Sequence, residues 1–336
     1  RDSAYCALGT LGRDLPDFEF TSAQDSRTIF DLASLTKALV TTPLIFFLSE
    51  KIKKPINASV GYWLTGIDHK LDPKLCAIKV EDLLAHTSGL SAWRNLWVCQ
   101  LGTKPDSILA APDHRRQLIV EKLNQASSTM SVRGTDVYSD LGFILLGHVV
   151  ELLSNSDLAG SFRDLKRKIT ADNLPTLSFG CELKDTNSIV PTSFCALRQR
   201  QLIGEVHDEN CAALGGIAGH AGLFGSGRDV GAYLNALCRS DLGRVMLQEN
   251  ANRRVLPITN PPNASLMGWR QGADATSQPF GSGAAIGHMG FTGVAFWLWP
   301  ERDRYVILLT NRVISGRQTP GIAQMRREVF SELAAM

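Results

Sequence analysis

A serine and a lysine stand three residues apart in the segment FDLASLTKALVTT, residues 30–42. In a helix, positions i and i+3 share one face with their side-chain carbons about 5–6 Å apart, so Lys37 can approach Ser34. A serine hydroxyl is a poor nucleophile unless a neighbouring base or cation helps it to lose its proton. If Ser34 begins the helix, its backbone N–H is unpaired, and the positive end of the helix dipole favours an oxyanion there. The pair has the parts of an acyl-transfer site, although two fixed residues also occur together by chance.

Four further segments follow in order: LLAHTSGL (83–90), VYSDLGFILLG (137–147), GHAGLFGSGRDV (219–230) and GHMGFTG (287–293). Together with FDLASLTK they resemble the motifs of the serine β-lactamase and penicillin-binding-protein superfamily, in which S-x-x-K has two companions. The resemblance is to the branch that contains class C β-lactamases, DD-peptidases and related esterases. It extends from about residue 30 to the LLTNRV segment that ends at residue 313. The ordered coincidence of these segments is far more specific than any one of them.

The resemblance implies a serine hydrolase in which Ser34 is the nucleophile and Lys37 activates it. Tyr138 occupies the Y-x-N position and would be the general base that later protonates the leaving group. A tyrosine, with an ordinary pKa near 10, serves as a base only if cations lower that pKa, and Lys37 is the obvious cation. Outside this context, Tyr138 is equally compatible with a half-buried aromatic side chain ahead of a helix.

The segment GHMGFTG stands where the family carries its K-T-G motif. By the resemblance, His288 takes the lysine position and offers an N–H toward the tyrosine or the substrate. Gly290 lets the strand pass close to the ligand. The backbone N–H of Phe291 is the expected second oxyanion donor, beside that of Ser34. Outside this context, a histidine at position 288 would more often be a structural or surface residue.

Two expected substrate-binding positions depart from the family pattern. Asp140 stands where relatives often have asparagine, and a carboxylate near Lys37 would keep the lysine protonated but repel an anionic substrate. Met289 replaces a threonine whose hydroxyl often binds a substrate carboxylate; methionine cannot make that bond, and it enlarges the apolar wall. Both changes favour neutral esters or amides of small acyl groups. The alternatives are a D-alanyl-D-alanine carboxypeptidase, a weak β-lactamase, or a catalytically feeble relative that binds cell-wall peptides or a partner protein.

Composition narrows the partners and cofactors. The 336 residues are 44% hydrophobic and 20% charged, with a net charge of +2 and no basic block with interleaved aromatics, so nucleic acid is not an expected partner. The expected partner is a small-molecule or peptide acyl substrate. The seven cysteines form no C-x-x-C pair, which argues against a zinc site. A serine hydrolase that works through an acyl-enzyme is expected to need neither a metal nor an organic cofactor. We interpret VHDEN (206–210) as a loop bordering the cleft rather than a metal site, and His86 as a structural residue beside the active site. The glycine cluster at 215–227 is not expected to bind a nucleotide.

The most apolar run, residues 38–48, is too short to span a bilayer, and no signal peptide is visible. The scattered, odd-numbered cysteines argue against a disulfide framework and favour the cytoplasm. Because the chain starts at Arg1 rather than methionine, a removed leader would instead allow the periplasm. The sequence does not address the oligomeric state.

Strand signals gather at the two ends of the chain. Short mixed runs in residues 1–30 suit strands and turns. VAFWLW and RYVILLTNR, joined by PERD, predict a hairpin, and residues 321–336 have helical periodicity. Residues 34–50 predict a buried helix. Pro43 should either kink this helix or lie where a backbone hydrogen bond is already lost. We therefore expect a sheet assembled from both ends of the chain.

The middle of the chain, from about 60 to 200, is expected to be mostly helical. VEDLLAHTSGL predicts a helix that ends at Gly89, and DLGFILLGHVVELLS a helix capped by Ser139 or Asp140. With the family resemblance, this predicts an α/β (α+β) fold: a mainly antiparallel sheet flanked by helices, with an inserted helical domain and the site in the cleft between. The predicted sheet domain comprises residues 1–60 and 204–336, and the helical domain residues 61–203.

Overall fold

A six-stranded antiparallel sheet joins the two ends of the chain. The computed structural model describes residues 3–11, 13, 16–22, 25–96, 112–171, 173–183, 187–253, 266–272, 285–318 and 320–335. The strand order is β2-β1-β11-β10-β9-β8. The strands are β1 (Ala4–Thr10), β2 (Phe18–Thr21), β8 (Arg270–Gln271), β9 (Ile286–Met289), β10 (Ala295–Trp299) and β11 (Arg304–Thr310). β1 pairs antiparallel with β11, so the expected union of the two ends is confirmed.

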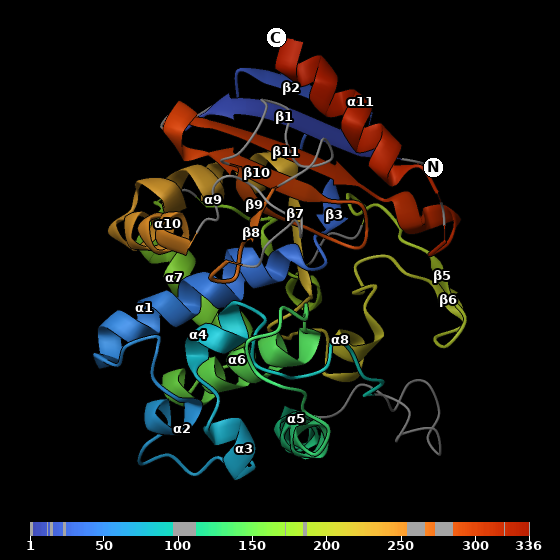
Figure 1. Ribbon diagram of the computed structural model, residues 1–336. Helices are drawn as coiled ribbons and strands as arrows, with labels where there is room; N and C mark the ends of the chain where they lie inside the picture. The colour runs from blue at the N-terminus through green and yellow to red at the C-terminus, as the bar shows by residue number, and fades with distance from the viewer. Residues whose placement is uncertain are drawn as a thin grey trace.

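Both faces of this sheet are buried, which explains why β10 and β11 are apolar at nearly every position. Successive strand residues point to opposite faces. Tyr305, Ile307 and Leu309 enter the main core, whereas Val306 and Leu308 enter a smaller cluster with Phe330 and Leu333. The latter two belong to α11 (Ile322–Ala335), which crosses the outer face of the sheet (Figure 1). The predicted hairpin and final helix are confirmed; η5 (Pro300–Arg302) forms the hairpin turn.

A second, three-stranded sheet leads into the helix that carries the serine and lysine. Its order is β3 (Ile29–Asp31), β7 (Leu223–Ser226) and β4 (Ser178–Phe179), and a separate pair joins β5 (Phe194–Cys195) to β6 (Arg200–Gln201). The middle of the chain is therefore not purely helical. Its division into a sheet domain and a helical domain stays a prediction.

The helices gather on the inner side of the main sheet (Figure 1). α6 is buried along most of its length, and Ser139 caps it by accepting the Gly142 N–H at 3.1 Å, as one of the two predicted caps. The predicted end of the VEDLLAHTSGL helix was wrong: this helix ends at Leu84, because His86 takes a left-handed backbone with φ of +59°. The helices are α1 (Thr42–Ile52), α2 (Val60–Trp63), α3 (Pro73–Cys76), α4 (Val80–Leu84), α5 (Pro112–Ser127), α6 (Asp140–Ser154), α7 (Leu158–Ile169), α8 (Glu209–Ala213), α9 (Gly227–Arg239), α10 (Asp241–Arg253), with short turns η1 (Lys37–Thr41), η4 (Gly180–Glu182) and η6 (Arg312–Ser315).

The expected helix over residues 34–50 begins with a π-helical turn, η1, and continues as α1. Pro43, near the start of α1, has no N–H to give to the preceding turn. Two side chains supply donors there: the Tyr233 hydroxyl bonds the Leu39 carbonyl at 3.0 Å, and the Trp269 indole bonds that of Ala38 at 3.3 Å. The proline therefore sits where other residues replace the missing backbone bond.

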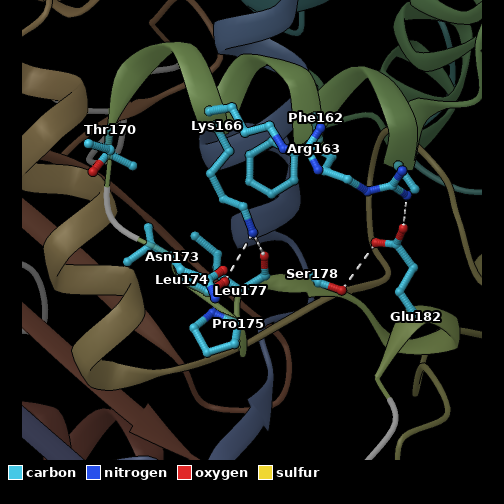
Figure 2. Close-up of a pocket in the computed structure, with 13 residues that line it drawn as sticks. Phe162, Arg163, Lys166, Thr170, Asn173, Leu174, Pro175, Leu177, Ser178 and Glu182 are labelled. Carbon is cyan, nitrogen blue, oxygen red and sulfur yellow. Dashed lines mark hydrogen bonds and ion pairs between the residues drawn. The ribbon is translucent and has the colours of Figure 1, made fainter.

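A pocket of about 550 Å³ lies between α7 and residues 173–178 (Figure 2). The Lys166 and Arg163 side chains that line it bond to groups of the protein itself. Lys166 Nζ donates to the carbonyls of Leu174 and Leu177 at 3.0 and 2.7 Å, and Arg163 pairs with Glu182. These contacts fasten the segment that leads into β4. Although this pocket is spacious, the serine–lysine pair lies elsewhere.

Within the described ranges, no single helix is long and apolar enough to cross a membrane; α6 and α7 reach that composition only as a pair bent by 75°.

Candidate active site

Ser34 lines a pocket of about 420 Å³ and contacts the buried Lys37. Lys37 Nζ donates to Ser34 Oγ at 3.0 Å, as the i, i+3 spacing predicts. Ser34 lies in the turn between β3 and η1. Its own N–H has no hydrogen-bond partner among the described residues, because the turn bonds run from the N–H groups of Leu35 and Thr36. The hydroxyl and an unpaired backbone donor thus face the same space.

Lys37 is fully buried, with 0% of its side chain exposed. Its ammonium has three acceptors: Ser34 Oγ, Asp140 Oδ1 at 2.7 Å and the His220 carbonyl at 3.1 Å. Burial lowers the pKa of Lys37, but Asp140 and Tyr138 raise it, and the net result lies above the ordinary value. The lysine is therefore a fixed cation beside the serine hydroxyl, as the sequence analysis expected of a carboxylate at position 140.

Tyr138 lies between Lys37 and two histidines. Lys37 Nζ is 4.9 Å from the centre of the tyrosine ring. On the other side, the His86 ring packs against Tyr138 with centroids 4.5 Å apart, and His86 Nδ1 accepts the Ser139 N–H at 2.9 Å. Burial, Lys37 and nearby cations keep the pKa of His86 well below its usual value. His86 thus packs beside the site and orders the start of the segment that carries Tyr138, and its interpretation as a structural residue stays a prediction.

His288 reaches the pocket from β9, with its ring 6.0 Å from that of Tyr138. Burial, Lys37 and Arg270 lower the pKa of His288 to about 3, so the imidazole is neutral. Its Nδ1 bonds the Met289 carbonyl at 2.8 Å and must carry the proton. Nε2, which has no partner among the described residues, is then an acceptor. This differs from the expected N–H donor: a local backbone contact fixes the tautomer.

Gly290 and Phe291 follow β9 and border the nucleophile turn. A Cβ at Gly290 would collide with Val294 and lie 2.9 Å from the Leu32 carbonyl, so glycine is needed for close approach to the backbone before Ser34. The expectation had been close approach to a ligand. The Phe291 N–H has no partner within the described chain. The Phe291 side chain is 44% exposed and lies between the His207 ring and Arg312.

Met289 lines the pocket, but its sulfur is directed away from it. Sδ accepts from Arg326 Nη1 at 3.1 Å, and the side chain packs with the cluster beneath α11. The reason is strand alternation, since His288 faces the pocket and its neighbour must face the opposite side. The expected enlargement of the apolar wall by Met289 is thus small.

Several pocket residues escaped the sequence analysis. Arg270 lies with its guanidinium carbon 5.4 Å from the Tyr138 ring centre, and Trp93, 47% exposed, stands at the mouth. Arg317 also lines the pocket and pairs with Glu209. Nothing in local spacing indicates these residues, because they come from segments far apart in sequence.

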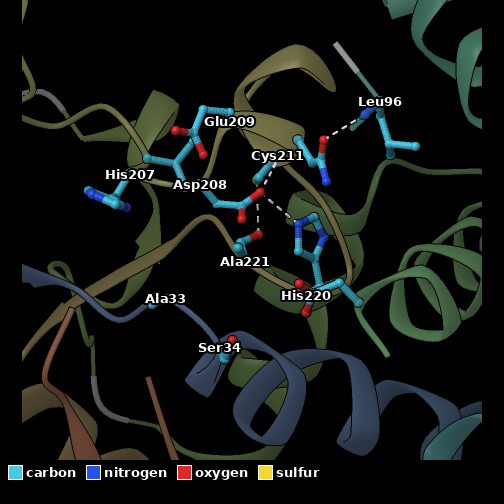
Figure 3. Close-up of polar contacts among 12 residues, drawn as sticks. Ala33, Ser34, Leu96, His207, Asp208, Glu209, Cys211, His220 and Ala221 are labelled. Carbon is cyan, nitrogen blue, oxygen red and sulfur yellow. Dashed lines mark hydrogen bonds and ion pairs between the residues drawn. The ribbon is translucent and has the colours of Figure 1, made fainter. Parts of the chain in front are cut away.

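An acid–histidine pair, the half-buried Asp208 and the buried His220, lies beside the serine (Figure 3). His220 Nε2 lies 2.9 Å from Asp208 Oδ1, which also accepts the Cys211 N–H at 2.7 Å. Burial raises the pKa of Asp208, but His220 and the Cys211 N–H lower it further, so the carboxylate is ionised. The segment 206–210 does border the cleft, as expected. Among the described residues, no group of three or more histidine, cysteine or acidic side chains is placed to hold a metal.

Comparisons with known proteins agree with this arrangement. The family model described as Beta-lactamase matches residues 14–329. The chain is 28% identical over 323 residues to an N-acetylmuramyl-L-alanine amidase of Bacillus subtilis (strain 168), covering 88% of this chain and 72% of that protein. It is 24% identical over 320 residues to a putative D-alanyl-D-alanine carboxypeptidase of Salmonella typhi, with the same coverages of 88% and 72%.

Solved structures share the fold. The octameric penicillin-binding protein homologue from Pyrococcus abyssi superposes with a TM-score of 0.69 at 14% identity, covering 99% of this chain and 73% of that one. EstCE1, a hydrolase with promiscuous acyltransferase activity, gives a TM-score of 0.64 at 18% identity, covering 97% and 93%.

Proposed function

Because the chain belongs to the Beta-lactamase family, we propose that it hydrolyses esters or amides through an acyl-enzyme on Ser34. The predicted family and β-lactamase-like fold are confirmed, and with them the class of serine-type hydrolase. The observation that carries the proposal is the 3.0 Å contact between Lys37 Nζ and Ser34 Oγ inside a pocket. A binding protein that does not catalyse has no need of a buried cation at a serine hydroxyl.

In the first step, Tyr138 acts as a phenolate: Ser34 Oγ attacks the carbonyl carbon, and the serine proton passes to Tyr138 Oη. Lys37 cannot accept this proton, because Asp140 and Tyr138 outweigh burial and hold it as an ammonium. Instead, the positive charge of Lys37 stabilises the developing alkoxide of Ser34 and the Tyr138 oxygen. His288 Nε2, neutral and without a partner in the described chain, is available as an acceptor for a hydroxyl beside Tyr138.

The tetrahedral intermediate carries its negative charge on the former carbonyl oxygen. The backbone N–H groups of Ser34 and Phe291, which have no partner among the described residues, are the proposed donors to that oxygen. Removing one such donor typically lowers kcat by about 10²–10³-fold. Gly290 allows the second donor to approach the first, since any side chain there would push the turn after β9 away from Leu32.

The intermediate then collapses and the second half of the reaction reverses the first. Tyr138 gives its proton to the leaving alcohol or amine, which departs and leaves an ester on Ser34. A water molecule then attacks that ester and gives a proton to the Tyr138 phenolate. When the acid is released, Tyr138 returns this proton to Ser34 Oγ and becomes a phenolate again.

Small, neutral acyl esters or amides fit the charges around the serine. Lys37 pairs with Asp140 and Arg317 with Glu209, while the Asp208 carboxylate bonds His220. These contacts pair much of the charge around the pocket within the protein itself, so an uncharged substrate enters at little cost in desolvation free energy. Because Asp140 is held by Lys37, its repulsion of anionic substrates is weaker than the sequence suggested.

A second candidate, hydrolysis of peptides with a free carboxylate, is favoured by Arg270. Its guanidinium lies on the pocket wall, 5.4 Å from the Tyr138 ring centre. The relatives named as a carboxypeptidase and an amidase are consistent with such substrates. The two candidates are separated by kcat/KM for p-nitrophenyl butyrate against that for a D-alanyl-D-alanine peptide and nitrocefin.

The test of the nucleophile is Ser34→Ala, measured with p-nitrophenyl butyrate and with a fluorophosphonate followed by mass spectrometry. We expect the parent to gain one phosphonyl group and the variant to lose both labelling and hydrolysis. Ser49→Ala, which changes a serine bonded to the Lys54 carbonyl in α1, is the matched control and should keep both. Activity of Ser34→Ala within a few-fold of the parent would refute the proposal, and an unlabelled parent would favour a binding protein.

A further inference from the structure

Asp31 is a buried carboxylate, 2% exposed, at the end of β3 and three residues before Ser34. Its Oδ1 accepts the Ala33 N–H at 2.8 Å, and its Oδ2 accepts the His207 N–H at 2.7 Å. Its backbone carbonyl accepts the Thr292 hydroxyl at 2.7 Å. One residue therefore ties together the turn before the nucleophile, the loop at 207–208 and the turn after β9.

Each of these three segments borders the reacting centre. Ala33 has φ of +46°, a left-handed conformation that residues other than glycine rarely adopt, and it immediately precedes the Ser34 N–H. Thr292 immediately follows Phe291, which supplies the second proposed oxyanion donor. His207 and Asp208 form part of the pocket wall. The hydrogen bonds that Asp31 accepts hold these three segments in position relative to one another.

We propose that Asp31 is a positioning residue that holds Ser34 and the two oxyanion donors in their reactive arrangement. This inference rests on the proposed function, since it assigns a role in the same reaction. Asp31 does not touch the substrate; its carboxylate acts through the backbone N–H groups of Ala33 and His207, and its carbonyl through the Thr292 hydroxyl. A change at Asp31 should therefore affect the chemical step, measured by kcat, rather than substrate binding.

The geometry requires an ionised carboxyl group. Two N–H donors need two acceptor oxygens, which a carboxylate provides, whereas an asparagine would present an NH₂ group to one of them. Burial raises the pKa of Asp31 to about 6, with Asp208 raising it further and Arg198 and the two N–H donors opposing. At neutral pH both oxygens accept. As the pH falls through about 6, one oxygen becomes a hydroxyl and loses its N–H partner.

The test compares Asp31→Asn with the parent in p-nitrophenyl butyrate hydrolysis from pH 5 to 8. We expect kcat to fall about 10–100-fold with KM within about threefold, because a misplacement of about 1 Å near the reacting atoms can lower the rate about 10²-fold. The parent should lose kcat as the pH falls through about 6, and the variant should lack that inflection. Fluorophosphonate labelling of Ser34 should slow in parallel.

Asp229→Asn is the matched control. Asp229 is also buried and accepts two hydrogen bonds, from the N–H and hydroxyl of Thr176 in a segment away from the pocket. It should lower the melting temperature without moving kcat or the pH inflection. If Asp31→Asn does not fold, Thr292→Val removes only the hydroxyl bond to Asp31 and should lower kcat several-fold with KM unchanged.

Three results would overturn the inference: parent-like kcat in Asp31→Asn, an unchanged inflection near pH 6, or an equal loss of kcat in Asp31→Asn and Asp229→Asn. A folded Thr292→Val variant with parent kcat would do the same if Asp31→Asn is unfolded. Ser34→Ala separates this failure from failure of the proposed function. If Ser34→Ala is inactive while Asp31→Asn is not impaired, only the role of Asp31 is wrong.

Discussion

Replacing Asp140 by asparagine should expose the cost of burying the Lys37 ammonium. Asp140 Oδ1 lies 2.7 Å from Lys37 Nζ, and the lysine is 0% exposed. Asparagine keeps the size and one acceptor oxygen but removes the negative charge. The remaining acceptors, Ser34 Oγ and the His220 carbonyl, are neutral. The variant therefore contains a buried ammonium that has lost the carboxylate paired directly with it.

The size of the effect follows from this burial. Removing one member of a buried ion pair typically costs about 3–5 kcal/mol of stability. Because the Asp140 side chain is 18% exposed and asparagine still accepts, we expect the lower end, about 3 kcal/mol. An unfolding entropy of about 2.1 cal/mol/K per residue gives roughly 0.7 kcal/mol/K for 336 residues, so the melting temperature should fall by about 4 °C.

The loss should shrink as the pH rises. In the parent, the folded pKa of Lys37 lies above its ordinary 10.5, so the lysine is protonated in both states below that pH and contributes no slope. In Asp140→Asn, burial is the largest influence on the pKa of Lys37 and is opposed by Tyr138 and the Asp208 carboxylate, without the directly paired Asp140, so the folded pKa should fall below 10.5. Between that lowered pKa and 10.5 the unfolded chain binds more protons than the folded chain, and stability rises with pH.

The assay is calorimetry or thermal fluorimetry of parent and variant at pH 7, 8, 9 and 10. The difference in melting temperature should be largest at pH 7 and decrease toward pH 10. Asp157→Asn, a carboxylate that caps α7 by bonding the Gly160 N–H, is the control, and its difference should not vary with pH. A difference for Asp140→Asn that stays constant or grows with pH would show that Lys37 is not destabilised as a buried cation.

Other changes probe the remaining parts of the site. Tyr138→Phe removes only a hydroxyl and should lower kcat about 10²–10⁴-fold with little change in melting temperature; retained turnover would move the general base to another group. Gly290→Ala should destabilise the fold by about 1–3 kcal/mol and lower kcat, because its Cβ meets Val294 and the Leu32 carbonyl, and a parent-like variant would contradict that packing. Arg270→Gln should reduce kcat/KM for a D-alanyl-D-alanine peptide more than for p-nitrophenyl butyrate; equal losses would remove the basis of the carboxypeptidase candidate. Stability should fall as the pH drops below 6.5, because burial lowers the pKa of His86, His207 and His288, so that the unfolded chain binds protons that the folded chain does not. Asp31, whose pKa is raised in the folded state, acts in the opposite direction. Melting temperatures that rise between pH 6.5 and 4.5 would refute this prediction.

Local signals in the sequence predicted local structure well. The approach of Lys37 to Ser34 follows from their three-residue spacing, which the turn leading into η1 keeps as a helix would. The capping of α6 by Ser139 follows from a hydroxyl one residue before an apolar helix. The β10–β11 hairpin follows from two apolar runs around a short turn. In each case the interacting groups are a few residues apart, so the chain's own geometry brings them together.

Contacts between distant segments were decided only by the tertiary structure. Asp31 bonds His207 across 176 residues, and no spacing rule could have paired them. The tautomer of His288 depends on a carbonyl whose position β9 fixes, and the direction of Met289 depends on which face of the sheet α11 covers. The left-handed backbone at His86, which ended a helix earlier than Gly89 suggested, lies where the segment packs against Tyr138. The sequence by itself determined which residues could do chemistry, because those types and spacings are local. Only folding decided which atoms face the pocket, because that depends on the elements that pack around it.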